Sequence, residues 1–299
     1  MKKRVLSVFL LLSFSLLLSA VDIDGDGSVE TDWTTITVEG VEMKWDGYRV
    51  KESESDLDPY MVTFDDIGEG RFFQTEYPVE RETYAINQGN LGESEVLHIK
   101  GEEPGPAIYI VAGVHGDEKA AWYAGIMLKN ATISSGDLYI LSPANVPGAQ
   151  KKRRYFYASE DLNRSFPGRE DGNEAERMAN AIYSDISRIS PDLVLDLHEA
   201  ILYTSQRDFL GSTYIFSNLD GMEDLFFSLL WATEDGEICH NDFGYNGPGP
   251  KGSINRSVTD GLGIPSITVE TFRGFDIKRR IYDQLDTVQF ILQWHGMVQ

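Results

Sequence analysis

Short apolar segments alternate with segments of helical periodicity along most of this 299-residue chain. Runs of consecutive or alternating apolar residues predict strands, because such segments are buried on one or both faces of a sheet. Apolar residues spaced three and four positions apart predict helices with one buried side. The predicted strands are Ser94–Ile99, Ile108–Ala112 (after a turn at Glu102–Pro106), Leu138–Leu141, Leu193–His198 and Pro265–Glu270, and the predicted helices are Lys119–Leu128, Asn173–Ile189, 221–235 and Ile277–Trp294.

Strands that alternate with helices are typical of α/β proteins. We therefore expect a mostly parallel or mixed twisted sheet with helices on both faces, formed by residues 84–299. The chain is long enough, and at 41% hydrophobic residues apolar enough, for one sizeable core with a short N-terminal extension.

The first 83 residues differ from this pattern. Residues 1–20 combine a basic start, an apolar stretch and a small-residue end at Ser19-Ala20, which is typical of a secretory signal peptide. Because the apolar run is short for a bilayer span, we expect cleavage and a secreted or cell-envelope location rather than a retained membrane anchor. Residues 21–83 are expected to be an acidic linker and a small β extension, with a hairpin or a loosely packed arm within residues 34–62.

The charge balance limits the partners of the protein. The chain has 48 acidic and 26 basic residues, for a formal net charge of −22. Cleavage after residue 20 would make the charge more negative still, because it removes three cations and no acid. Such a surface repels nucleic acid and anionic membranes, so we expect neither as a partner. Cys239 is the one cysteine, which excludes an internal disulfide.

Two residues capable of binding a metal lie in the turn between the strand Ile108–Ala112 and the helix Lys119–Leu128. His115 and Glu118 are three positions apart in this turn. An imidazole and a carboxylate on one tight turn can bind one small cation, and zinc suits mixed nitrogen and oxygen ligands. A catalytic zinc ion takes three protein ligands and a water, so a third ligand should come from elsewhere in the chain.

Two further polar residues end predicted strands, namely His198 and Glu270. The carboxyl ends of parallel strands share one edge of the sheet, and ligands bind at that edge in open α/β sheets. A single histidine at a strand end is usually structural. Polar, metal-capable residues at three equivalent strand ends instead indicate a functional site.

The ordered set of motifs resembles a known superfamily. It consists of His115-x-x-Glu118, Asp161-Leu162-Asn163-Arg164, Asp196-Leu197-His198-Glu199 and a glutamate, Glu270, near the C-terminus. This set is similar to the zinc carboxypeptidases, and most similar to their succinylglutamate desuccinylase/aspartoacylase branch, over roughly residues 84–299. The segment Gly263–Thr271 looks more like the cell-wall-type carboxypeptidases of bacteria.

The resemblance implies a zinc carboxypeptidase-like fold and a role for each motif. His115, Glu118 and His198 would bind one zinc ion per chain and leave a fourth position for water. Glu270 would take the proton of that water and pass it to the leaving nitrogen.

The resemblance also implies a set of residues that handle negative charge. An arginine just before the Asp-Leu-Asn-Arg motif, Arg154 or Arg153, would stabilise the oxyanion of the tetrahedral intermediate. Asn163 and Arg164 would bind a substrate carboxylate, which arginine can hold with two parallel hydrogen bonds. Asp161 would orient a ligand histidine by bonding its second ring nitrogen.

These expectations predict a zinc metallohydrolase that cleaves an amide or peptide bond next to a carboxylate. Two substrate types remain open. Predicted export favours a carboxypeptidase acting on peptides, whereas the Asp-Leu-Asn-Arg motif favours an N-acyl amino acid amidohydrolase of the desuccinylase/aspartoacylase type. A non-catalytic zinc-containing binding module is a third alternative, against which the intact Glu270 argues, because a binder needs no base there.

Overall fold

The computed structural model describes residues 33–38, 40–46, 49–52, 57–201, 211–218, 220–240 and 243–299. The expected signal peptide and most of the acidic linker lie outside these ranges. None of the helices described has both the length and the apolar character that a bilayer crossing requires.

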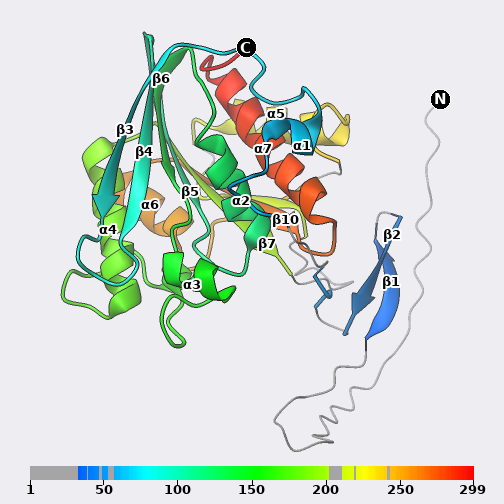
Figure 1. Ribbon diagram of the computed structural model, residues 1–299, viewed down its shortest axis with the longest axis horizontal. Coiled ribbons are helices and arrows are strands. Elements are labelled where there is room, and N and C mark those ends of the chain that lie inside the picture. Colours follow the sequence, from blue (N-terminus) through cyan, green and yellow to red (C-terminus); the bar gives the residue numbers. More distant parts are fainter. Residues whose placement is uncertain are drawn as a thin grey trace, which may run out of the picture.

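An eight-stranded mixed sheet forms the centre of the molecule (Figure 1), with the strand order β3-β4-β6-β5-β7-β10-β8-β9. Its middle is a parallel block of β6, β5, β7 and β10, while β4 and β8 join the block antiparallel. The strands are β3 (Val79–Ile86), β4 (Ser94–Gly101), β5 (Glu103–Ala112), β6 (Ser135–Leu141), β7 (Leu193–Ala200), β8 (Thr213–Phe216), β9 (Gly244–Asn246) and β10 (Ser266–Phe272).

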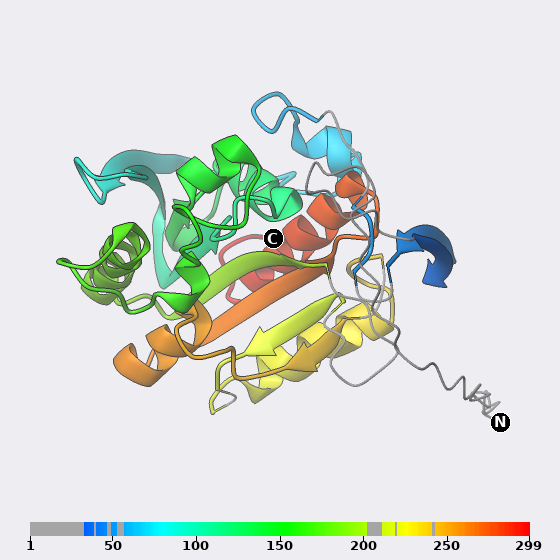
Figure 2. The ribbon, with the colours of Figure 1, turned by 90° about the horizontal axis from the view of Figure 1, so that it is seen from below.

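Helices cover both faces of the sheet (Figures 1 and 2). One face packs against α2 (Lys119–Leu128), α5 (Glu223–Glu234) and α7 (Ile277–Trp294), with the short α1 (Phe64–Gly68) against α7. The other face packs against α4 (Glu174–Ile189) and α6 (Ile254–Leu262). The expected α/β class, a mixed sheet with helices on both faces, is therefore confirmed.

The central strand β5 shows why its apolar run is continuous. Ile108 and Ile110 enter the core beneath α2 and α7, whereas Tyr109 and Val111 enter the core beneath α4 and α6. Side chains alternate across a strand, so a strand covered on both faces is apolar at every position.

The start of β5 differs from the expected turn at Glu102–Pro106, because the strand begins at Glu103. The register between β5 and β6 shifts between Glu103 and Ala107. Proline lacks a backbone donor and is tolerated in strands at such irregularities. The two prolines of this segment therefore mark an irregular strand start rather than a turn.

The N-terminal extension contains a hairpin, one of the two alternatives expected there. Strands β1 (Thr34–Val38) and β2 (Val41–Trp45) pair antiparallel in a sheet of their own. The hairpin lies beside the end of the main sheet where β7 and β10 finish (Figures 1 and 2). Its apolar side chains and Val50 pack against Phe272 and Phe275, which follow the expected base Glu270.

A buried ion pair joins three elements behind the strand ends. The Arg280 guanidinium of α7 is fully buried and pairs with Glu199 of β7 and with Glu52 of the N-terminal segment. The second oxygen of Glu199 accepts a hydrogen bond from the backbone N–H of Ala120, at the start of α2. Removing one partner of such a pair leaves an uncompensated buried charge.

We predict that Arg280→Met lowers the free energy of unfolding by about 3–5 kcal/mol, because Glu199 then stays buried without its cation. Urea unfolding followed by circular dichroism measures this loss. The exposed Lys278→Met, two positions away on α7, is the matched control and should cost less than about 1 kcal/mol. Equal losses in the two variants would show that the pair contributes nothing beyond a surface contact.

Candidate active site

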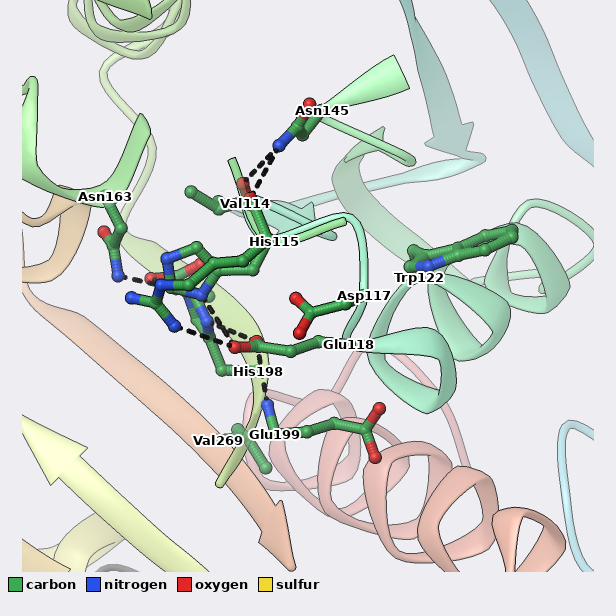
Figure 3. Close-up of polar contacts among 12 residues, drawn as sticks. Val114, His115, Asp117, Glu118, Trp122, Asn145, Asn163, His198, Glu199 and Val269 are labelled. Carbon is green, nitrogen blue, oxygen red and sulfur yellow. Dashed lines mark hydrogen bonds and ion pairs between the residues drawn. The ribbon is translucent and has the colours of Figure 1, made fainter. Parts of the chain in front are cut away.

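The turn Gly113–Glu118, called here the metal turn, depends on glycine at two positions. Gly113 has a φ of +76°, a left-handed conformation that residues with a side chain rarely adopt. A Cβ atom on Gly116 would lie 2.0 Å from the carbonyl carbon of Gly148 in α3 (Val146–Lys151), so a larger residue could not pack there. The Asn145 amide donates to a carbonyl of the turn at 3.1 Å (Figure 3).

The three expected metal ligands come together in a buried space. The Glu118 carboxylate lies between two imidazoles (Figure 3), with Oε1 2.7 Å from Nδ1 of His115 and Oε2 2.8 Å from Nδ1 of His198. One ligand atom from each residue lies within 4.8 Å of the others. The metal turn and β7 thus bring two imidazole nitrogens and one carboxylate to a common point.

A carboxylate lies behind each imidazole. Asp161 Oδ1 is 3.1 Å from Nε2 of His115, and Asp196 Oδ2 is 3.0 Å from Nε2 of His198. Such partners favour the proton on Nε2 and leave the Nδ1 lone pair for a cation. Asp161 therefore occupies the position expected of it, and Asp196 does the same for the second histidine.

The charge of this cluster fits a metal ion. Asp196 is fully buried, and among the described residues neither of its oxygens makes a well-aligned hydrogen bond. Buried carboxylates need a cation nearby to offset the loss of hydration. The donor set of two imidazoles and one carboxylate suits a divalent transition metal.

Glu270 lies directly beside the ligands. In the parallel pairing of β10 with β7, Glu270 is the register partner of His198. Glu270 also lines a cleft that His115 and Glu118 line. Burial raises the pKa of Glu270 to about 7, a shift that His198 reduces and Glu118 increases. A carboxylate with a pKa near neutrality can both accept and return a proton.

Arg154 reaches the cluster from the loop after α3. Its Nη2 donates to Asp161 Oδ2 at 2.9 Å, and its Nη1 lies 3.6 Å from Glu118 Oε1. Arg154 lines the cleft, whereas Arg153 is exposed and is not among the lining residues. Of the two arginines considered from the sequence, the structure therefore brings Arg154 to the site.

The short helix η1 (Leu162–Arg164) forms part of the wall of the cleft, through Asn163 and Arg164. The Asn163 amide nitrogen lies 3.4 Å from Nε2 of His198, and Asn163 Oδ1 accepts a hydrogen bond from the Ile254 backbone at 3.1 Å. Arg164 is exposed at this wall and bonds the carbonyl of Asn163. Both residues face a cleft of about 470 Å³ that also contains the metal turn.

Sequence reasoning missed two supports of the site. Gln284 of α7 donates to the carbonyl oxygen of His198 at 2.7 Å, and the pattern around Gln284 carries no signal of this contact. Asp196 did carry a signal, because residues two apart on a strand face the same side and Asp196 therefore accompanies His198. Ile215 of β8 also lines the cleft, and residues 202–210 lie outside the described ranges.

Residues 104–215 match the family model of the succinylglutamate desuccinylase/aspartoacylase catalytic domain. The matched region contains the metal turn, the Asp-Leu-Asn-Arg motif and His198. The resemblance predicted from the motifs is thus confirmed. The comparison with curated proteins found no match.

Several solved structures share the fold. A succinylglutamate desuccinylase from Silicibacter sp. TM1040 is 17% identical with a TM-score of 0.58, over 75% of this chain and 72% of that one. A succinylglutamate desuccinylase/aspartoacylase from Rhodobacter sphaeroides is 19% identical with a TM-score of 0.55, over 83% and 70%. The murein-tripeptide amidase from Escherichia coli O157 is 19% identical with a TM-score of 0.52, over 75% and 95%.

These similarities show the fold of the protein. It has the α/β fold of the carboxypeptidase-like metallohydrolases, with a buried His-Glu-His cluster at the carboxyl edge of the sheet. Within that class, its central region carries the pattern of the desuccinylase/aspartoacylase catalytic domain.

Proposed function

We propose that this protein is a zinc-dependent hydrolase that cleaves an amide or peptide bond adjacent to a carboxylate. The observation that carries the proposal is the cluster of His115, Glu118 and His198, of which His115 and Glu118 line the same cleft as Glu270, the register partner of His198. Zinc is the metal that the donor set favours, because a catalytic zinc site takes three such ligands and keeps one position open.

Glu270 is the proton carrier of the proposed reaction. Zinc in such a site lowers the pKa of a bound water towards about 7 and polarises a substrate carbonyl. Glu270, beside the ligands, would take the proton of the attacking water and deliver it to the leaving nitrogen. Its raised pKa suits both steps, because a strong acid would not accept the proton and a strong base would not return it.

The arginines of the cleft supply fixed positive charge. Arg154, held by two hydrogen bonds to Asp161, would stabilise the negative oxygen that develops during attack on the carbonyl. Asn163 and Arg164, which also line the cleft, would hold the carboxylate next to the scissile bond. The substrate is therefore a small molecule or a peptide that bears a carboxylate.

Two substrate types are supported by different observations. The family match favours an N-acyl amino acid amidohydrolase, because it covers the region that contains the proposed ligands and the Asp-Leu-Asn-Arg motif. The structural similarity to a murein-tripeptide amidase supports the carboxypeptidase alternative. A non-catalytic binding module is disfavoured, because Glu270 lies in the same cleft as His115 and Glu118, where a binder would need no base.

We predict that Glu270→Gln retains zinc but lowers kcat by two orders of magnitude or more on whichever amide the wild type cleaves, because the general base is lost. The assay uses C-terminal dipeptides, wall-type peptides and N-acyl amino acids, with and without a chelator. Elemental analysis of the variant separates loss of metal from loss of base. Near-normal turnover in Glu270→Gln would remove Glu270 from this role, and turnover unaffected by full removal of metal would overturn the proposed function.

We also propose that the protein is exported, on the strength of the basic, apolar and small-residue order of residues 1–20. N-terminal sequencing of the protein from its host should find Val21 as the first residue, in the envelope or the medium. An intact Met1 on protein that stays inside the cell would contradict export.

A further inference from the structure

The N-terminal segment contributes a side chain to the cleft. Arg49 follows the hairpin β1–β2 and lines the same cleft as Arg154, Asn163 and Glu270. It lies outside the region matched by the family model, which starts at residue 104. Its side chain is 54% exposed.

The segment that carries Arg49 is fixed at the strand ends. The backbone N–H of Val50 donates to the carbonyl of Ile201 at 3.2 Å, directly after β7, and the Val50 side chain is buried against Phe272. Glu52 forms ion pairs with the buried Arg273 and Arg280. Two residues that follow Arg49, Val50 and Glu52, are thus tied to the ends of the strands that carry the proposed ligand and base, which holds Arg49 at the cleft.

The Arg49 guanidinium is only partly engaged. Asp46 accepts hydrogen bonds from the Arg49 backbone N–H at 2.6 Å and from Nε at 3.3 Å. The contact with Asp46 orients the Arg49 side chain through Nε of its guanidinium. Within the part of the chain that the structure describes, Asp46 is the one carboxylate paired with Arg49, so the amino groups Nη1 and Nη2 are available to a ligand.

The other arginines of the cleft are either paired with carboxylates of the protein or assigned to another group of the substrate. Arg273 is neutralised by Glu52 and Asp117. Arg154 is bonded to Asp161, and the proposed function assigns Arg164 to the carboxylate beside the scissile bond. In a chain with a net charge of −22, one more arginine at this cleft stands against the general charge of the surface and indicates an anionic ligand.

We propose that Arg49 is a specificity-determining residue that binds a second anionic group of the substrate, at a distance from the carboxylate held by Asn163 and Arg164. This proposal rests on the proposed function, since it places the substrate in the same cleft. The favoured substrates are then amides or peptides with two carboxylates. Arginine suits this role, because its planar guanidinium pairs with a carboxylate through two hydrogen bonds.

The test compares ligands that differ by one charge. Zinc-loaded Glu270→Gln protein, which should bind amides without cleaving them, is titrated by calorimetry with N-acetyl-aspartate and N-acetyl-asparagine, and with the glutamate and glutamine pair. We expect that N-acetyl-aspartate binds about tenfold more tightly than N-acetyl-asparagine, or that the glutamate ligand does so relative to the glutamine ligand. A tenfold difference in affinity is the scale of one charge-assisted contact. Adding Arg49→Gln should remove this preference and leave the affinity for the asparagine or glutamine ligand, which carries a single carboxylate, within about twofold.

Two further variants separate charge from structure. Arg49→Lys keeps the cation and should retain part of the preference, while Lys51→Gln removes an exposed cation of the same segment that does not line the cleft and should change nothing. Melting temperatures of all variants should agree with the parent protein. An unchanged preference in Arg49→Gln, or no preference and no binding in the parent, would overturn the role of Arg49. A preference that survives in a protein that cleaves no amide would instead count against the proposed function alone.

Discussion

The carboxylate of Glu118 between the two imidazole Nδ1 atoms is the contact on which the site depends. It draws the metal turn onto β7, and the backbone N–H of Glu199 fixes it with a further hydrogen bond to Oε2 at 3.0 Å. Two further carboxylates, Asp161 and Asp196, lie against the Nε2 atoms of His115 and His198. So much buried negative charge is costly without a cation, which supports the proposed metal ion between these residues.

The same constraint explains why the supports lie so deep in the protein. Gln284 holds the backbone of His198, and the Arg280–Glu199 pair ties β7 to α2 and α7 directly behind the cleft. These buried polar groups would hold the proposed ligands in place before an ion binds. The stability of the core and the geometry of the site are therefore properties of the same residues.

Much of this arrangement could be read from the sequence, because the relevant signals are local. Continuous apolar runs identified β5 and β7, helical spacing identified α2 and α7 with their bounds, and metal-capable residues at strand ends identified His198 and Glu270. The position of Arg49 could not be read in this way. It depends on the packing of Val50 on Phe272 and the pairing of Glu52 with Arg273, contacts between residues more than two hundred positions apart.

The most direct test of this account is anomalous diffraction at the zinc absorption edge from crystals of the zinc-loaded protein. The account predicts one strong peak per chain, bonded to Nδ1 of His115, Nδ1 of His198 and the carboxylate of Glu118, with one position open towards Glu270. A peak elsewhere in the molecule, or none at these three residues in protein that binds zinc in solution, would contradict it.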